Sequence, residues 1–190
     1  MSNASVRYSI ISILFHWSVA ALVIFLAVQG ALIDDMPRET KAWWVNLHSA
    51  IGIATTILLL ARIFWRIGHK PPPLPEGTAP WVERASHIAH WLLYALMVIV
   101  SISGLINIFA RGRGVDFGAF AIPQLMPSTR SVIRPADESH AILAYVLMGI
   151  AAVHILAAAW HQFWLKDHLM LRMMPEAKAS DLTEGESQHG

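Results

Sequence analysis

Four stretches of the chain are apolar and contain no Asp, Glu, Lys or Arg: residues 9–33, 42–61, 85–110 and 139–165. Each is long enough to cross the hydrocarbon core of a bilayer, which takes about 20 residues as a helix. Backbone groups in lipid have no water to bond to, so a helix is the expected conformation of each stretch. The pattern predicts an all-α fold, a transmembrane four-helix bundle with helices over about 9–33, 42–66, 84–110 and 138–165.

The polar segments between these stretches show no internal repeat and no second domain. Residues 71–75 are rich in proline and predict an extended linker. The third connection, residues 111–138, is long enough to carry a function of its own. The first stretch is too long for the apolar part of a cleavable signal peptide. We therefore expect one membrane domain over residues 1–175 and a disordered tail over 176–190.

Composition agrees with a membrane protein and excludes several classes of site. Apolar residues make up 55% of the chain and charged residues 14%, and the mean hydropathy is +0.49. A net charge of +1 leaves no electrostatic footprint for nucleic acid. The absence of cysteine excludes disulfides, Cys-ligated zinc, thiolate-bound iron–sulfur clusters and c-type haem attachment.

Lys and Arg are distributed unevenly between the two sides of the predicted bundle. Eight fall on the side of the N-terminus: Arg7, Arg62, Arg66, Lys70, Arg84, Lys166, Arg172 and Lys178. Six fall on the opposite side: Arg38, Lys41, Arg111, Arg113, Arg130 and Arg134. Because cytoplasmic segments carry the excess of Lys and Arg, this count favours both termini in the cytoplasm.

Histidine inside a membrane helix is costly to bury and marks a candidate functional site. His140 and His154 lie 14 residues apart on the fourth helix, a rise of roughly 21 Å that places them near opposite faces of the bilayer. His48 lies early in the second helix, near the outer face, and His16 early in the first helix, near the inner face. Two pairs follow, His48 with His140 outside and His16 with His154 inside. This arrangement suits two b-type haems, each with its iron held by two imidazoles.

A porphyrin beside its ligand's helix needs a small residue one turn along. The residues four positions after the four histidines are all small: Ala20, Gly52, Ala144 and Ala158. On the third helix, His87 and His90 are followed at the same spacing by Trp91 and Tyr94, which would block a haem, so neither histidine is expected to bind iron.

Other metals and a transporter are the alternatives to haem. Imidazole also binds zinc and copper, but two pairs separated by roughly 21 Å do not form one tetrahedral site. A proton or cation transporter normally has an intramembrane Asp or Glu, and the four stretches contain none. A transporter that uses histidines without haem is kept as a third hypothesis, which an absorption spectrum would decide.

Four sequence features bear on family: Phe15-His16-Trp17, His48-Ser-Ala-Ile-Gly52, the His140/His154 pair with His161, and Leu171-Arg-Met-Met-Pro175. Together they resemble the bacterial cytochrome b561 family, over about residues 8–175. The resemblance implies a four-helix di-haem cytochrome b of the bacterial inner membrane, with the four histidines as haem ligands. Members of similar size and plan oxidise superoxide at the periplasmic face and reduce ubiquinone.

The favoured function is therefore a superoxide:ubiquinone oxidoreductase, a superoxide oxidase with two b haems in the lipid bilayer. The alternative is a haem b membrane anchor that carries electrons between a dehydrogenase or hydrogenase partner protein and the quinone pool. Such an anchor is expected to be encoded beside its catalytic subunit, whereas a superoxide oxidase needs no protein partner.

Further residues have candidate roles around the inner haem. Arg62, 14 residues after His48, either pairs with a haem propionate or anchors the helix at the cytoplasmic surface. His161 lies two turns beyond His154 and is expected to donate protons to ubiquinone, since imidazole can shuttle protons. His87 and Trp164 are candidates to line the same quinone site, although Trp164 also fits an interfacial aromatic belt.

The outer face carries more cations than the distribution rule predicts. Five of them are candidates for a funnel that attracts the superoxide anion to the outer haem: Lys41, Arg111, Arg113, Arg130 and Arg134. Such a funnel would raise the encounter rate about 10-fold or more and lose its effect at high salt. Haem propionates or lipid headgroups are the other partners that these side chains could bind.

Overall fold

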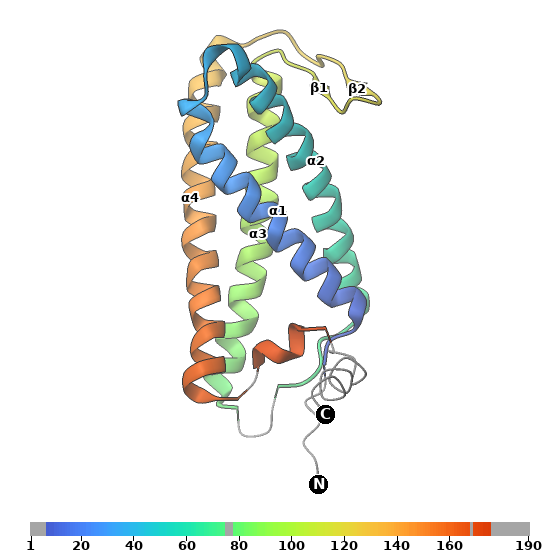
Figure 1. Ribbon diagram of the computed structural model, residues 1–190, viewed down its shortest axis with the longest axis vertical. Helices are drawn as coiled ribbons and strands as arrows, with labels where there is room; N and C mark the ends of the chain where they lie inside the picture. The colour runs from blue at the N-terminus through green and yellow to red at the C-terminus, as the bar shows by residue number, and fades with distance from the viewer. Residues whose placement is uncertain (1–6, 75–77, 168, 176–190) are drawn as a thin grey trace, which may run out of the picture.

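The computed structural model describes residues 7–74, 78–167 and 169–175, and its main elements are four long helices (Figure 1). Their bounds are Ile10–Leu32 (α1), Arg38–Gly68 (α2), Pro80–Ala110 (α3) and Arg130–Trp160 (α4). Each is long and apolar enough to cross a membrane. The predicted all-α fold with a transmembrane four-helix bundle is confirmed. The expected tail, residues 176–190, lies outside the described residues.

Three of the helices begin earlier in the chain than the charge-free stretches predicted. The starts expected at about 42, 84 and 138 are found at Arg38, Pro80 and Arg130. Pro37 precedes α2 and Pro80 is the first residue of α3, positions at which a missing N–H costs nothing. The extra turns carry charged side chains, which a helix end outside the hydrocarbon core tolerates.

The start of α4 corrects the predicted length of the third connection, which is residues 111–129 rather than 111–138. Pro135 lies inside α4, where proline removes one backbone hydrogen bond and usually disfavours a helix. Arg134 and Glu138 flank it and form an ion pair one turn apart, at 2.7 Å. This pair is exposed and contributes little to stability. Hydrogen bonds from Asn107 and Arg111 of α3 to Asp137 tie the start of α4 to α3, and a hydropathy pattern does not reveal them.

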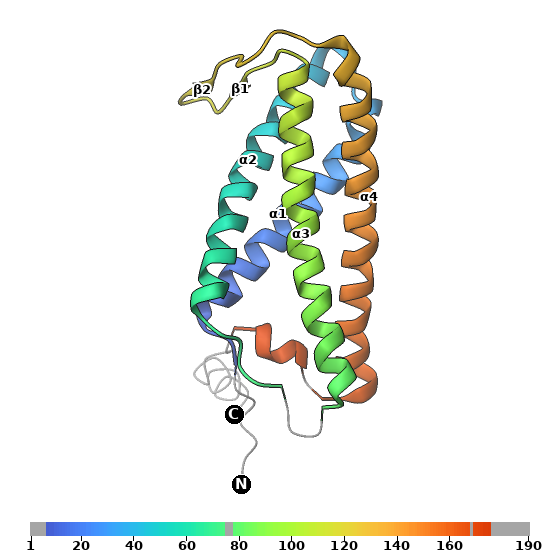
Figure 2. The ribbon, with the colours of Figure 1, turned by 180° about the vertical axis from the view of Figure 1, so that it is seen from behind.

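The helices run alternately up and down, and each packs on its neighbour in the chain (Figures 1 and 2). α3 lies along α4, whereas α1 crosses α2 obliquely. Inside the bundle, Val19, Leu59 and Tyr94 form a buried cluster that joins α1, α2 and α3. Many large apolar side chains on the outside are exposed, as expected for a surface that faces lipid.

One end of the bundle, here called the hairpin end, carries the only strands among the described residues. Val115–Asp116 (β1) pairs antiparallel with Ala121–Ile122 (β2). Gly118 turns the chain with a φ of 83°, and the rings of Phe117 and Phe120 stack at 4.7 Å. The side chain of Asn46 on α2 makes two hydrogen bonds, of 2.8 and 2.9 Å, to the backbone of Asp116. The hairpin is thereby fastened to α2.

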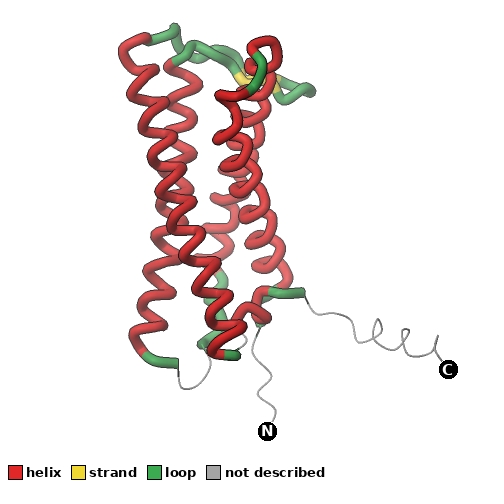
Figure 3. Tube along the Cα trace, turned by 60° about the vertical axis from the view of Figure 1, so that its left-hand side comes forward, coloured by secondary structure: helices red, strands yellow, loops and turns green. Residues whose placement is uncertain are grey.

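At the opposite end, here called the η3 end, the residues that follow α4 (orange-red in Figure 1) turn back across the bundle. Figure 3 shows the long helices from another side. A π-helical turn, His161–Leu165 (η2), continues α4, and a 3-10 turn, Leu169–Met173 (η3), follows. The indole N–H of Trp17 on α1 donates to the carbonyl of Met173 at 2.7 Å. The buried guanidinium of Arg172 donates to the carbonyls of Pro72 and Pro73 at 3.1 and 2.7 Å. These bonds tie η3 to α1 and to the connection between α2 and α3.

Candidate functional site

His48 on α2 and His140 on α4 face each other near the hairpin end. Their ring centroids are 6.2 Å apart, and the two rings are perpendicular, at 89°. Each histidine lies ten residues after the first residue of its helix, Arg38 in α2 and Arg130 in α4, so the two rings lie at a similar depth. The structure therefore brings together the pair that the sequence predicted for the outer face.

A serine on α3 fixes the protonation of His140. The hydroxyl of Ser103 donates its hydrogen to the carbonyl of Val100 at 2.7 Å, so it can only accept from His140. Its Oγ lies 2.9 Å from Nδ1 of His140. Nδ1 therefore carries the proton, and Nε2 keeps the lone pair that a metal ion needs.

Two glycines on neighbouring helices make room for the rings of the outer pair. A Cβ at Gly104 of α3 would lie 3.1 Å from Cε1 of His140, and a Cβ at Gly30 of α1 would lie 3.2 Å from Cε1 of His48. Side chains at these positions would push against both imidazoles. Neither the two glycines nor Ser103 were found by sequence reasoning, because their role depends on which helix faces are in contact.

Two buried polar atoms near His48 have no hydrogen-bond partner among the described residues: Nδ1 of His48 and Oε1 of Gln29. The amide nitrogen of Gln29 donates to the carbonyl of Trp44, one turn before His48, at 3.1 Å. An imidazole that binds iron through Nε2 carries a proton on Nδ1, and this proton needs an acceptor. A buried amide oxygen at this depth is an acceptor of the required kind.

The outer pair fits a haem with two imidazole ligands. Two imidazoles that bind one metal ion from opposite sides, at about 2 Å per bond, hold their ring centroids about 6 Å apart. The 6.2 Å between His48 and His140 matches this spacing, and Nε2 of His140 is unprotonated. Within the described residues, no cluster of three or more His, Asp or Glu side chains could hold a bare metal ion.

Toward the η3 end, His16 on α1 contacts Arg62 on α2. A guanidinium nitrogen of Arg62 lies 2.9 Å from Nδ1 of His16, and the guanidinium lies over the ring of Tyr94, 5.3 Å from its centroid. A guanidinium only donates, so Nδ1 of His16 accepts in this contact. Iron binding through Nε2 requires a proton on Nδ1. Arg62 and His16 therefore cannot keep this hydrogen bond once a metal is bound, which leaves the guanidinium for an anionic group.

His154 on α4 lies beside His90 on α3, a contact that the sequence did not predict. Their ring centroids are 5.3 Å apart, at 73°. Nδ1 of His90 donates to the carbonyl of Ser86 at 2.7 Å, so its Nε2 is unprotonated. One turn along α3 from His90, the ring of Tyr94 is buried in the bundle core, which is the obstruction that the sequence indicated beside His90.

His161, the predicted proton donor to quinone, begins the π-helical turn at the η3 end. Its Nδ1 lies 2.5 Å from a carboxylate oxygen of Asp167, a residue that the sequence analysis did not single out. His87 is exposed on α3. Trp164 is 72% exposed and stacks on Trp160 at 5.0 Å. Of the three residues predicted for the quinone site, His161 alone has a polar partner recorded within the described part of the chain.

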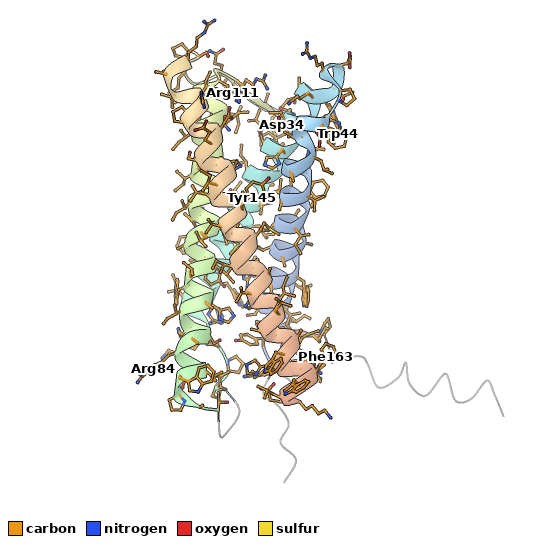
Figure 4. The ribbon with its side chains drawn as sticks, turned by 90° about the vertical axis from the view of Figure 1, so that its left-hand side faces the viewer. Asp34, Trp44, Arg84, Arg111, Tyr145 and Phe163 are labelled. Atoms are coloured by element: carbon orange, nitrogen blue, oxygen red, sulfur yellow. The ribbon has the colours of Figure 1, made fainter. Side chains whose placement is uncertain are left out.

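The five cations proposed for a donor funnel all lie at the hairpin end, and three of them are paired with carboxylates. The pairs are Lys41 with Asp34 at 2.7 Å, Arg111 with Asp137, and Arg134 with Glu138. Figure 4 shows Asp34 and Arg111 at this end, and Arg84 and Phe163 at the other. Arg113 and Arg130 are exposed, and neither forms an ion pair with another described residue.

Asn107 extends the Arg111–Asp137 pair into a network between α3 and α4. Its amide donates to Asp137 at 2.7 Å and accepts from Arg111 at 3.0 Å. Asn107 lies one turn from Ser103, and Asp137 lies one turn from His140. The network therefore adjoins the outer histidine pair on its hairpin side.

Comparison with known proteins agrees with the resemblance seen in the sequence. Residues 7–176 match the family described as prokaryotic cytochrome b561. A protein of Yersinia pestis named probable superoxide oxidase CybB is 30% identical over 173 residues, which is 90% of this chain and 98% of that protein. Cytochrome b561 homolog 2 of Escherichia coli strain K12 is 29% identical over 94% of this chain and 96% of its own length. A Cereibacter sphaeroides protein named cytochrome b562 is 31% identical over 88% of this chain and 94% of its own.

Proposed function

The chain belongs to the prokaryotic cytochrome b561 family of membrane electron-transfer proteins, and on that basis we propose that it is a superoxide:ubiquinone oxidoreductase. In this proposal, superoxide is oxidised at the hairpin end and ubiquinone is reduced at the η3 end, and two b haems, when bound, would supply the one-electron chemistry between the two ends. The hairpin end faces the periplasm, and both termini lie on the cytoplasmic side of the bacterial inner membrane. Residues 1–175 form a single di-haem domain.

The ligands of the two haems are His48 with His140 and His16 with His154. The first pair is supported by the 6.2 Å spacing of its rings and by the unprotonated Nε2 of His140. The second is supported by the sequence, since His16 and His154 lie near the same end of α1 and α4. A bound b haem supplies reversible one-electron exchange at its iron. Arg62 is the cation that would hold a propionate beside His16.

Haem stoichiometry tests the ligand assignment. Purified wild-type protein is expected to contain two b haems per chain, by pyridine haemochrome assay against protein concentration. Replacing His48 or His140 with Ala is expected to remove one haem and leave the other spectrally intact. A stoichiometry of one in the wild type would contradict the assignment.

Superoxide is favoured as the donor because of the charge at the hairpin end. Exposed cations that lack carboxylate partners, Arg113 and Arg130, attract a small anion toward the end at which His48 and His140 lie. Superoxide brings its own electron and needs no protein docking surface. The relative from Yersinia pestis carries the name probable superoxide oxidase, which agrees with this choice of donor.

Stopped-flow reduction of the oxidised protein by superoxide tests the donor. The rate is expected to be fast and to fall steeply as ionic strength rises. A slow rate that does not depend on salt, or no reduction, would overturn the superoxide proposal. That result would favour the alternative of a membrane anchor for a catalytic subunit, for which co-purification of a dehydrogenase or hydrogenase partner is the direct assay.

Ubiquinone is the proposed acceptor, bound near His161 at the η3 end with His87 and Trp164 as further lining residues. Quinone reduction consumes protons, and His161 is partly accessible to water, with 20% of its side chain exposed. Reoxidation of the reduced haems by a short-chain ubiquinone tests this role. His161→Ala protein with normal haem content and an unchanged rate of reoxidation would exclude His161 from the site.

A further inference from the structure

The turn after α4 folds a carboxylate back onto His161. Lys166 has a φ of 54°, a left-handed conformation that reverses the chain directly after the π-helical turn. The backbone N–H groups of Lys166 and Asp167 both point to the carbonyl of His161, the second at 3.3 Å. A left-handed non-glycine residue is uncommon and costs free energy. The contact between Asp167 and His161 is formed in spite of that cost.

Both oxygens of the Asp167 carboxylate are engaged. Oδ2 lies 2.5 Å from Nδ1 of His161, and Oδ1 accepts from the backbone N–H of Leu169 at 3.2 Å. The carboxylate is therefore held in one orientation between η2 and η3. The side chains of His161 and Asp167 are only 20% and 29% exposed, so the pair is partly screened from water and remains reachable by it.

A carboxylate on Nδ1 determines what the other ring nitrogen does. It accepts the proton of Nδ1 and holds the ring in one orientation, so Nε2 is the nitrogen left to a ligand and carries the transferable proton when the ring is protonated. Since η3 is itself tied to α1 and to residues 72–73, this arrangement is part of the closed η3 end rather than of a loose chain end.

We infer that Asp167 is the positioning residue that holds His161 as the proton donor to ubiquinone. This inference rests on the proposed quinone site. Reduction of one ubiquinone to ubiquinol takes two electrons, which two superoxide ions supply as each becomes O₂, and two protons. In each proton transfer, Nε2–H of the His161 imidazolium passes its proton to a quinone oxygen, and the imidazole regains a proton from water. Asp167 remains hydrogen-bonded to Nδ1 throughout.

The test is stopped-flow reoxidation of pre-reduced, full-length protein by a short-chain ubiquinone, with four variants. Asp167→Asn is expected to lower the rate of reoxidation at saturating ubiquinone about 10-fold or more, because a positioned general acid contributes a rate factor of at least this size. The ubiquinone concentration at half-maximal rate is expected to change less than about twofold, because binding of the quinone does not need the carboxylate. Asp167→Glu keeps a carboxylate and is expected to keep most of the rate.

The remaining variants and one addition separate positioning from folding. Glu83→Gln, an acid-to-amide change in the first turn of α3 at the same end, is the matched control and is expected to be silent. Added formate is expected to restore part of the rate of Asp167→Asn, which a merely structural defect would not allow. If Asp167→Asn does not retain haem, the Asp167→Glu variant is used instead. A rate of reoxidation in Asp167→Glu as low as that in His161→Ala would contradict the inference.

The outcomes distinguish this inference from the proposal beneath it. A slow His161→Ala with a normal Asp167→Asn would overturn the role of Asp167 and leave the quinone site standing. Normal rates in both variants would remove the quinone role of His161 together with that of Asp167. Superoxide-driven reduction of the haems is expected to be unchanged in all four variants, which shows that the defect lies on the acceptor side.

Discussion

Ser103 on α3 holds the ring of His140 on α4 through a hydrogen bond of 2.9 Å to Nδ1. Its hydroxyl hydrogen is already donated to the carbonyl of Val100, so the serine is an acceptor that sets both the orientation and the tautomer of the imidazole. Partners of this kind outside the ligand shell commonly contribute 10- to 100-fold to metal affinity, roughly. The outer histidine pair is therefore positioned by three helices, α2, α3 and α4.

Replacing Ser103 with Ala is expected to weaken retention of the outer haem by about 10-fold while the inner haem stays bound. Nδ1–H of His140 loses its hydrogen bond to Oγ of Ser103, which loosens the orientation of the ring. Haem stoichiometry after gel filtration in detergent and a redox titration of each haem measure the effect. Ser101→Ala, on the same helix but a different face, is the control. Equal loss of both haems in Ser103→Ala would contradict the assignment of His140 to the outer site.

Replacing Gly104 with Ala is expected to disturb the same haem for a steric reason. The added Cβ would lie 3.1 Å from Cε1 of His140, closer than an ordinary van der Waals contact, and 3.4 Å from its Nδ1. Overpacking of this kind costs about 1–3 kcal/mol. Loss of outer-haem absorbance and a lower midpoint of thermal unfolding are the expected readouts. Gly149→Ala on α4, where a Cβ would meet no atom within 4 Å, is expected to behave as wild type.

His90 and His154 lie side by side, and their variants separate a ligand from its neighbour. His154→Gln is expected to remove the inner haem, whereas His90→Gln is expected to keep two haems per chain, because Tyr94 fills the core one turn from His90. The haem-to-protein ratio and the low-temperature absorption spectrum of each variant give the answer. Loss of a haem in His90→Gln with retention in His154→Gln would reassign the inner ligand to α3.

The ion pairs at the hairpin end predict that the five outer cations are not equivalent toward superoxide. Arg113→Gln and Arg130→Gln remove charges that no described carboxylate neutralises and are expected to slow reduction several-fold at low salt. Arg134→Gln removes a charge already paired with Glu138 and is expected to have a smaller effect. The rates of haem reduction by superoxide are compared by stopped flow at low and at high ionic strength. The differences between the variants and the wild type are expected to vanish at high ionic strength. An equal effect of all three substitutions would contradict the prediction that the unpaired cations attract superoxide more strongly than the paired ones.

The amino-acid sequence alone determined the four membrane helices. Whether a segment enters lipid depends on its own length and charge, so the charge-free stretches were enough to predict α1 to α4. The depth of His48 and His140 followed in the same way from the fixed rise of a helix, and the structure places their rings 6.2 Å apart. The early starts of α2, α3 and α4 were missed because charges at a helix end, and Pro135, break the hydropathy pattern without breaking the helix.

What surrounds those histidines follows from the packing of the helices against one another. Ser103, Gly104 and His90 belong to the sites through the face that α3 turns toward α4, and the direction of a helix face depends on packing between helices rather than on sequence spacing. Asp167 contacts His161 because the chain reverses at Lys166 in a left-handed conformation. Lysine seldom adopts this conformation, so the sequence does not predict the reversal. Hydropathy is a property that each segment carries by itself, whereas a hydrogen bond between two helices exists only after both have packed.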